Sequence, residues 1–259
     1  MPDPIQEFAI ECRDRVASYP INAPLVAAAQ SFLDASVAAK YSYNFSWLGR
    51  PIIQYPQDVL AVQEVIWRCR PDLIVETGVA HGGSLIFSAS MLTLLDVCDA
   101  LERGGSFDPR ASSRRVIGID IDIRSHNRQE IEKHPLSEMI DLVEGSSIDA
   151  GIVAGIQARA RQAQRVLVCL DSNHTHDHVL AELEAYAPLM TTGSYCIVFD
   201  TFIETCPAGS YPDRPWDKGR NPMTAVDAYL KDHSEFTIDQ AIDDKLLISV
   251  APRGFLRRS

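Results

Sequence analysis

The chain has 259 residues, of which 46% are hydrophobic, and a formal net charge of -11 at pH 7. This length suits one large α/β core with an N-terminal extension better than two independent domains. The acidic balance argues against a nucleic-acid partner, because phosphate binding needs clustered basic residues and we expect the only such cluster, Arg253, Arg257 and Arg258, to be a solvated C-terminus.

The N-terminal part of the chain is predicted to be helical. Apolar residues at helical spacing indicate helices over residues 4–18 and 24–40, and an aromatic-rich connection follows over residues 41–56. The aromatic side chains either shape the mouth of a substrate site or pack as an ordinary loop. We assign residues 1–56 to an N-terminal helical extension with its aromatic connection, and residues 57–259 to the core domain. The extension covers either that domain or a partner subunit, and we expect a homo-oligomer.

The core domain shows alternating strand and helix patterns, which predict a parallel sheet with right-handed crossovers. Its first strand, residues 73–75, is a short apolar run between Pro71 and Gly78, typical of a buried central strand. Further strands are predicted over residues 116–120, 140–144, 166–171 and 195–200, with a closing hairpin pair over 236–238 and 246–250. Helices are predicted over residues 58–70 and 222–233. One further helix should begin at residue 84, and another should end at residue 189. Residues 101–113 should form a surface excursion.

The cysteine pattern and the apolar runs bear on location. The six cysteines are scattered without a C-x-x-C motif, which is the usage of a reducing compartment. No charged start followed by an apolar core opens the chain, and no apolar run approaches membrane length. We therefore expect a cytoplasmic protein without a membrane span.

The segment after the first strand, Glu-Thr-Gly-Val-Ala-His-Gly-Gly-Ser over residues 76–84, predicts a tight turn that leads into a helix. Its glycines let backbone approach a ligand closely, and Ser84 is expected to cap the helix. The spacing is neither G-x-G-x-x-G nor that of a P-loop, so a nicotinamide dinucleotide fold loses support. It resembles the first motif of class I S-adenosylmethionine-dependent methyltransferases, in which the acid helps to hold the amino group of the cofactor. A tight turn of purely structural origin remains the alternative.

Polar residues fall where the strands of a parallel sheet end, which is where ligands bind in open α/β sheets. Asp120 is placed to accept hydrogen bonds from ribose hydroxyls, and a helix-capping role is the weaker interpretation. Ser147 is placed to bond an adenine edge, and a helix N-cap is an equally good interpretation. Asp171 and Asp200 end neighbouring strands, so that both carboxylates can reach one hard cation.

Three histidines follow the fourth strand, at positions 174, 176 and 178. His174 lies three residues past Asp171, where its imidazole can act as a general base. A zinc site made of the three histidines is the rival interpretation and has less support, because ligands at finger-like spacing are missing. We expect His176 and His178 to be solvated or capping residues.

Four motifs together resemble the cephalosporin hydroxylase family, which includes rhamnosyl O-methyltransferases and is similar to metal-dependent macrolide sugar O-methyltransferases. They are Gly-Arg-Pro-Ile-Ile-Gln-Tyr-Pro-Gln-Asp over residues 49–58, the turn over 76–84, Leu-Asp-Ser-Asn-His-Thr-His over 170–176 and Asn-Pro-Met-Thr-Ala-Val over 221–226. The resemblance implies a Rossmann-like class I methyltransferase fold, S-adenosylmethionine, usually Mg²⁺, and a hydroxyl acceptor on a sugar or antibiotic. From the glycine turn and the strand ends together, we expect cofactor contacts at Glu76, Gly78, Ala80, Gly82, Ser84, Asp120, Ser147 and Asp171.

The same resemblance assigns Asp171 and Asp200 to the metal, and His174 with Asp171 to catalysis. One position departs from the family, because Phe199 stands where many relatives carry a glutamate. Either Mg²⁺ then binds weakly with more water, or catalysis is independent of metal.

We therefore expect an S-adenosylmethionine-dependent O-methyltransferase that acts on a small-molecule or glycan hydroxyl. The segment over residues 202–220, rich in proline, glycine and aromatic residues, is expected to act as a substrate lid. The alternative is a non-catalytic S-adenosylmethionine-binding partner in a biosynthetic complex, which the Phe199 departure supports. An NAD-dependent oxidoreductase would need a dinucleotide turn that is not present.

Overall fold

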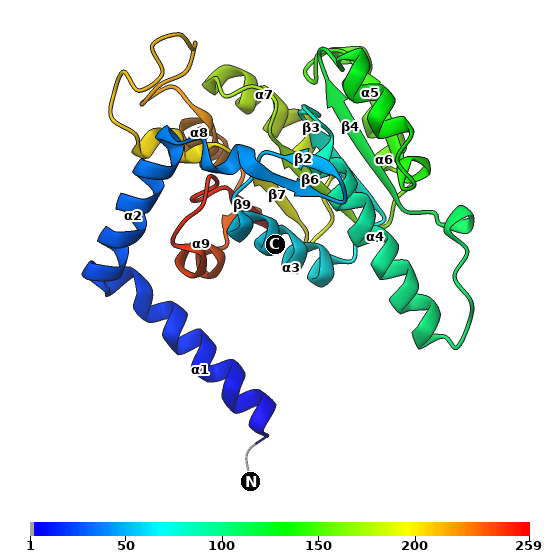
Figure 1. Ribbon diagram of the computed structural model, residues 1–259, viewed down its shortest axis with the longest axis horizontal. Coiled ribbons are helices and arrows are strands. Elements are labelled where there is room, and N and C mark those ends of the chain that lie inside the picture. The colour runs from blue at the N-terminus through cyan, green and yellow to red at the C-terminus, as the bar shows by residue number, and fades with distance from the viewer. Residues whose placement is uncertain (1–2) are drawn as a thin grey trace.

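The computed structural model describes residues 3–259 and is built on a seven-stranded sheet (Figure 1). The strand order is β5-β4-β3-β6-β7-β9-β8, with the first five strands parallel and β9 antiparallel to both of its neighbours. This confirms the predicted mostly parallel sheet. The strands are β3 (Leu73–Thr77), β4 (Arg115–Asp120), β5 (Ile140–Glu144), β6 (Val166–Leu170), β7 (Tyr195–Val198), β8 (Phe236–Ile238) and β9 (Phe255–Arg258).

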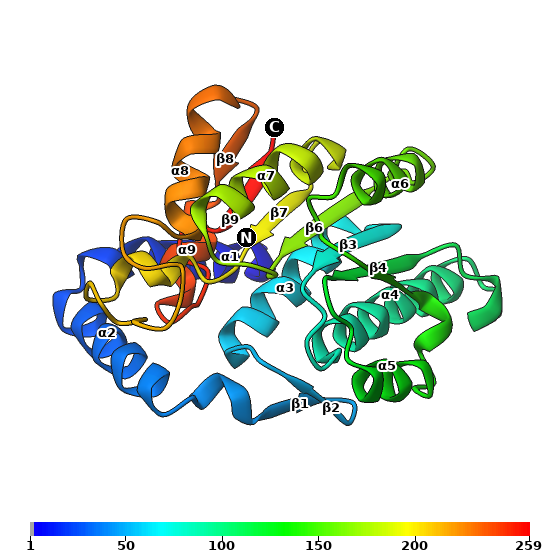
Figure 2. The same ribbon diagram turned by 90° about the horizontal axis from the view of Figure 1, so that it is seen from above.

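Helices cover both faces of the sheet, as Figure 2 shows from above. In β3 every side chain is buried, with Ile74 packed in one core cluster and Leu73 and Val75 in the other. Alternation between two covered faces explains why this strand is a continuous apolar run. One face carries α3 (Pro56–Cys69), α4 (Gly83–Glu102), α5 (Ser125–Glu132) and α9 (Gln240–Leu246), and the other carries α6 (Ala150–Ala160), α7 (His176–Tyr186) and α8 (Pro222–Asp232).

The N-terminal helices form as predicted, as α1 (Pro4–Ser18) and α2 (Ala23–Ala38), and α1 projects away from the body of the molecule (Figure 1). The aromatic connection holds a hairpin that was not predicted, made of β1 (Phe45–Trp47) and β2 (Arg50–Ile52). The Trp47 ring meets the Phe87 ring edge-on at 4.9 Å, and Tyr55 is fully buried. The packed-loop interpretation therefore describes these two residues, whereas Tyr43 is 59% exposed.

The end of the sheet differs from the prediction. Residues 246–250 form no strand: Leu246 ends α9, Leu247 has a φ of 58°, and the last strand is β9 instead. Gly254 lets this strand approach β7, since a Cβ there would lie 2.1 Å from the Val198 carbonyl oxygen. The expectation of a solvated C-terminus holds for Arg253 and Arg257, which are exposed, but not for Arg258, whose guanidinium donates to the Pro188 carbonyl at 2.9 Å.

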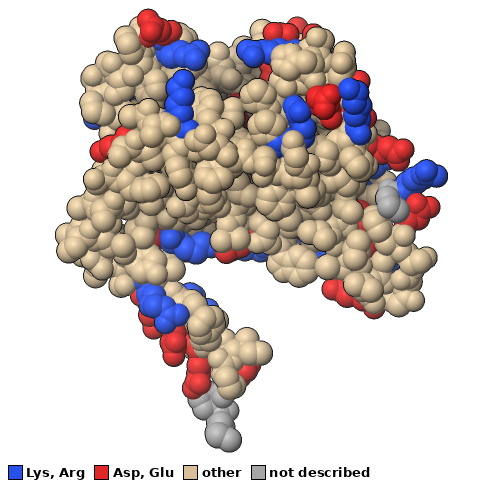
Figure 3. All heavy atoms as spheres, viewed as in Figure 1, with Lys and Arg blue, Asp and Glu red and all other residues tan. Residues whose placement is uncertain are grey.

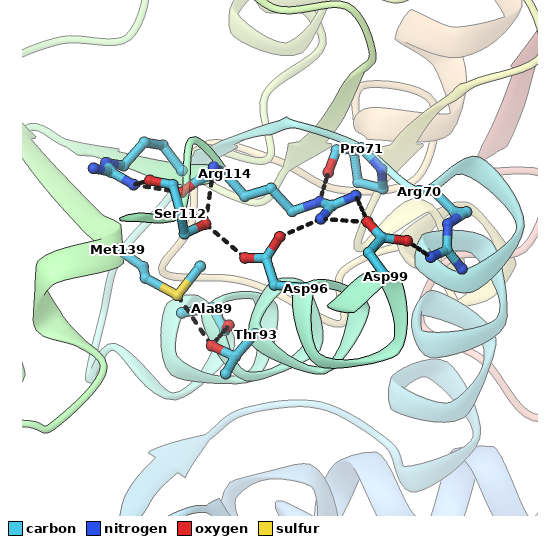
Figure 4. Close-up of polar contacts among 10 residues, drawn as sticks. Arg70, Pro71, Ala89, Thr93, Asp96, Asp99, Ser112, Arg114 and Met139 are labelled. Atoms are coloured by element: carbon cyan, nitrogen blue, oxygen red, sulfur yellow. Dashed lines mark hydrogen bonds and ion pairs between the residues drawn. The ribbon is translucent and has the colours of Figure 1, made fainter. Parts of the chain in front are cut away.

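Charged residues fix the long connection between α4 and β4 at the amino ends of the strands (Figure 4). The Arg114 guanidinium donates to Asp99 at 3.0 Å and also pairs with Asp96, while Arg70 pairs with the other side of Asp99. Ser112 donates to Asp96 at 2.6 Å. The network holds the predicted surface excursion to the sheet at the edge opposite the candidate site.

Within residues 3–259, α4 is the one helix long and apolar enough to cross a membrane by length and composition. The expectation that no apolar run approaches that length is therefore wrong for this segment. Its apolar character has a structural cause, because Leu85, Leu92 and Leu95 are fully buried in the core beside the sheet.

Candidate active site

The turn after β3 has glycine at two positions of positive φ. Gly78 has a φ of 90°, and a Cβ there would lie 2.0 Å from the backbone oxygen of Asp171. Gly82 has a φ of 82° and is the N-cap of α4, which begins at Gly83. Ser84 is therefore not the cap that the sequence predicted. Ala80 has a positive φ of 45°, an uncommon conformation for a residue with a Cβ, so this turn holds backbone strain.

Ser84 instead donates its hydroxyl hydrogen to the carboxylate of Glu76, at the end of β3. Glu76 is 4% exposed, and burial raises the pKa of its carboxyl to about 7 in spite of the Ser84 hydrogen bond. A buried acid at the end of a central strand, beside a glycine turn, is suited to a cationic ligand group.

Asp120 at the end of β4 points toward the same turn. Its carboxylate accepts hydrogen bonds from the backbone N–H groups of Val79 at 2.8 Å and Ala80 at 3.3 Å. It is not a helix cap, because α5 begins at Ser125. Asp120 thus joins two adjacent strand ends above the sheet.

Two side chains that hold the turn were missed from the sequence. The Arg50 guanidinium donates to the His81 carbonyl at 2.7 Å, and the Asn127 amide donates to the Ala80 carbonyl at 2.9 Å. Arg50 lies in the motif over residues 49–58, which was the available signal, whereas no signal marked Asn127.

Ser147 is buried, and its hydroxyl donates to the Glu182 carboxylate at 2.6 Å. The N-cap interpretation of Ser147 is wrong, because Asp149 caps α6 by accepting from Gly151 at 2.9 Å. Glu182 also accepts from Ser172 at 2.6 Å. This cluster was not predicted, and it joins the loop after β5 to the loop after β6.

The structure brings Asp171, His174 and Asp200 together, with one ligand atom from each lying within 4.8 Å of the others. His174 Nε2 lies 3.2 Å from the Asp200 carboxylate. Burial raises the pKa of Asp171 well above its usual range, and the nearby Asp200 and Glu76 raise it further. Two carboxylates and an imidazole that share one point fit a divalent cation.

Phe199 does not add to this cluster. Its side chain is 7% exposed and packs in the apolar core, and a phenylalanine provides no ligand atom. Among the described residues, Asp171 and Asp200 are therefore the two that offer a carboxylate ligand in this cluster.

The other two histidines turn away from the cluster, which excludes the three-histidine zinc site among residues 3–259. His176 Nδ1 lies 2.8 Å from the Thr224 hydroxyl, and His178 Nε2 lies 3.0 Å from the Ser147 hydroxyl. Both imidazoles are half-buried and bonded, so the expectation of solvated or capping residues is wrong.

The segment over residues 202–220 reaches the cluster through Trp216. The Trp216 ring meets the His174 ring edge-on, with centroids 4.8 Å apart. The Arg214 guanidinium lies over the Trp216 ring, 5.3 Å from its centroid. An aromatic side chain is thus positioned against the candidate base.

The strand order, the glycine turn and the acids at the carboxyl ends of β3 and β4 define a class I methyltransferase fold. The chain belongs to the family described as Rhamnosyl O-methyltransferase/CmcI, whose match covers residues 39–259. It is therefore an O-methyltransferase by family, and this confirms the family resemblance.

Curated relatives are similar over most of the chain. A rhamnosyl O-methyltransferase of Mycobacterium bovis (strain BCG / Pasteur 1173P2) is 28% identical over 204 residues, covering 78% of this chain and 73% of the relative. A protein of the same name from Mycobacterium leprae (strain TN) is 26% identical over 215 residues, covering 82% of each.

Solved structures share the fold. A structure of CmcI with Mg and SAM aligns with a TM-score of 0.53 at 19% identity, covering 84% of this chain and 77% of that one. The apo structure of CalS11, described as a TDP-rhamnose 3'-O-methyltransferase of calicheamicin biosynthesis, aligns with a TM-score of 0.52 at 17% identity, covering 100% and 96%. The second alignment includes the N-terminal helices.

Proposed function

We propose that this protein transfers a methyl group from S-adenosylmethionine to a hydroxyl of a sugar or of a glycosylated secondary metabolite. One observation carries the proposal: the backbone of Gly78, in the cofactor-type turn, packs directly on Asp171 of the Asp171, His174 and Asp200 cluster. A donor site and an acid–base cluster therefore adjoin. The sugar acceptor is supported by the names of the mycobacterial relatives and of CalS11.

The methyl donor is S-adenosylmethionine, which the residues at the carboxyl ends of β3, β4 and β5 would hold. Glu76 would accept from the amino group of its methionine moiety, Asp120 would accept from the ribose hydroxyls and Ser147 would bond the adenine. The glycine turn admits the backbone approach that this requires. The residues assigned to the cofactor are Glu76, Gly78, Ala80, Gly82, Ser84, Asp120, Ser147 and Asp171.

His174 acts as the general base toward the acceptor hydroxyl. Its Nε2 faces the Asp200 carboxylate at 3.2 Å, which leaves Nδ1 to take the proton. Asp200 would then stabilise the imidazolium that forms, which leaves the acceptor oxygen ready to receive the methyl group. Bound S-adenosylmethionine supplies the activated methyl group, and Mg²⁺ held by Asp171 and Asp200 would lower the pKa of the acceptor hydroxyl.

The segment over residues 202–220 acts as a lid that keeps water from the transfer. The support is the Trp216 ring on His174, together with the length of the segment and its lack of regular structure beyond a 3₁₀ turn. Closing of this lid over the acceptor would orient the hydroxyl toward His174.

The second candidate is a non-catalytic S-adenosylmethionine-binding partner in a biosynthetic complex. Phe199 is the observation that favours it, because loss of a carboxylate weakens any metal site. The intact contact between His174 and Asp200 favours the enzyme.

The proposal includes a cytoplasmic homo-oligomer. All six cysteines are free, which suits a reducing compartment. No residue of α1 is buried, and Ile5 and Phe8 are 79% and 63% exposed. Figure 3 shows few charged residues across the middle of the face along which α3 and α4 run, and these helices expose Leu60, Trp67 and Leu94. Such apolar area favours contact with a second copy of the chain.

The experiment is a methyl-transfer assay with isotope-labelled S-adenosylmethionine and a panel of rhamnosides, analysed by mass spectrometry. Label should appear on a sugar oxygen with the wild-type protein and fall sharply with His174→Ala, which should still bind S-adenosylhomocysteine. Cofactor binding without label on any acceptor, in a panel that a rhamnosyl O-methyltransferase does methylate, would favour the non-catalytic partner.

A further inference from the structure

A small cavity of about 30 Å³ lies beside the glycine turn, under the loop that follows β2. Its polar lining contains three acids and no Lys, Arg or His within the described chain. The lining comprises Gln54, Asp58, Glu76, Asp171, Ser84 and Ser88, with apolar side chains completing it. A cavity of this size holds one group as large as a water molecule, which is also the size of an ammonium group.

Gln54 has an unpartnered oxygen in this cavity. The residue is 7% exposed, and its Nε2 donates to the Asp171 carboxylate at 3.1 Å. Because that carboxylate is an acceptor, the contact directs the amide nitrogen toward Asp171 and leaves Oε1 as the free end. Oε1 is buried and has no hydrogen-bond partner. A buried carbonyl without a donor is unfavourable, so the site lacks a donor group that a ligand would bring.

The acids around Gln54 specify the charge of that donor. Asp58 is already satisfied by the Ser249 hydroxyl at 2.6 Å and the Val250 N–H at 3.0 Å, whereas Glu76 receives only the Ser84 hydrogen bond. Burial raises the pKa of Glu76 to about 7, because its ionised carboxylate has no counter-charge here. A cationic donor would supply both the hydrogen bond that Gln54 Oε1 lacks and the counter-charge that Glu76 lacks.

The backbone holds Gln54 in this position. A Cβ at Gly83 would lie 2.1 Å from the Pro51 carbonyl oxygen, so the segment leading to Gln54 lies directly on the glycine turn. The Arg50 guanidinium fastens the same segment to the His81 carbonyl at 2.7 Å. Gln54 is therefore presented to the turn by a segment that is anchored on both sides.

We propose that Gln54 is a cofactor-binding residue whose Oε1 accepts a hydrogen bond from the α-ammonium group of the methionine moiety of S-adenosylmethionine. Gln54 and Glu76 then hold that group from two sides, and Gln54 links it to Asp171 of the catalytic cluster. This inference rests on the proposed function, since it takes S-adenosylmethionine as the methyl donor. It explains why the loop after β2 carries a glutamine at a buried position.

The test is calorimetric binding of S-adenosylhomocysteine and of its deaminated analogue, which lacks only the ammonium group. Wild-type protein should prefer S-adenosylhomocysteine. Gln54→Ala should lower that affinity about tenfold or more, the effect of a lost hydrogen bond to a charged group, and should leave the affinity for the deaminated analogue within about twofold. Gln57→Ala is the matched control, because Gln57 also has a buried unpartnered Oε1 but does not line the cavity, and it should change neither affinity.

Equal weakening of both ligands by Gln54→Ala would show that Gln54 only supports the loop, and would overturn the inference. An effect that appears only with Mg²⁺ present would make Gln54 a metal ligand and would overturn it too. If wild-type protein binds neither ligand, the proposed function itself fails, and that result differs from the failure of the Gln54 contact alone.

Discussion

Replacing Glu76 by glutamine should make the cofactor-free protein more stable at alkaline pH while weakening cofactor binding. Glu76 is 4% exposed, and its only hydrogen bond comes from Ser84. Glutamine has nearly the same shape and its carbonyl can still accept from Ser84, but it carries no charge to desolvate. The variant therefore separates the cost of the buried charge from the packing of the side chain.

The size and direction of the effect follow from the pKa. Burial raises the pKa of Glu76 from 4.5 to about 7. Below 4.5 the carboxyl is protonated in both the folded and the unfolded chain, and it costs nothing. As the pH rises from 4.5 to 7 the unfolded chain ionises first, so the folded state loses stability, by on the order of 3 kcal/mol once the pH exceeds 7. At pH 5 less than about 1 kcal/mol of this cost is present.

Urea unfolding of the cofactor-free wild-type and Glu76→Gln proteins at pH 5 and pH 8 measures this. The stability of the variant relative to wild type should rise by about 2 kcal/mol between the two pH values. Glu132→Gln, at a side chain that is 58% exposed, should show no such change. A difference between Glu76→Gln and wild type that is the same at both pH values would refute the reasoning. S-adenosylhomocysteine should bind the Glu76→Gln variant at least about tenfold more weakly.

Three further variants test the site. Asp120→Ala should weaken S-adenosylhomocysteine binding by about 1.5–3 kcal/mol through loss of charge-assisted bonds to ribose, and an unchanged calorimetric affinity would remove Asp120 from the site. His174→Ala should lower turnover by about 10²–10⁴-fold with cofactor affinity nearly intact. Normal turnover in this variant, with loss of turnover in His176→Ala, would show that His174 is not the base. Phe199→Glu should add a carboxylate ligand and tighten Mg²⁺ binding, whereas full wild-type activity after exhaustive chelation would show that the reaction needs no metal.

Local patterns were sufficient to predict most of the sheet. The run ending at Glu76 is apolar on both faces and bounded by Pro71 and Gly78, so its place as a central strand follows from composition alone. The last strand could not be found in this way. Residues 246–250 are apolar enough for a strand, but the Asp58 carboxylate, far away in the sequence, binds Ser249 and Val250 in a turn. The true strand β9 has arginine at two of its four positions and resembled a basic tail.

The candidate site was also predictable only in part. Acids at the ends of parallel strands converge because the topology requires it, and the cluster of Asp171, His174 and Asp200 was predictable for that reason. The contacts that orient these groups were not, because they join distant segments: Gln54 reaches Asp171, and Asn127 reaches the Ala80 carbonyl. Sequence spacing carries no information about such pairs, even where the residue lies in a recognisable motif.

The most direct test of the account is calorimetric titration of the wild-type protein with S-adenosylmethionine, with NAD as the comparison ligand. The account predicts saturable binding of one S-adenosylmethionine per chain and no binding of NAD, since the turn over residues 76–84 suits the first cofactor and lacks the dinucleotide spacing. Binding of NAD, or the absence of S-adenosylmethionine binding by folded protein, would contradict it.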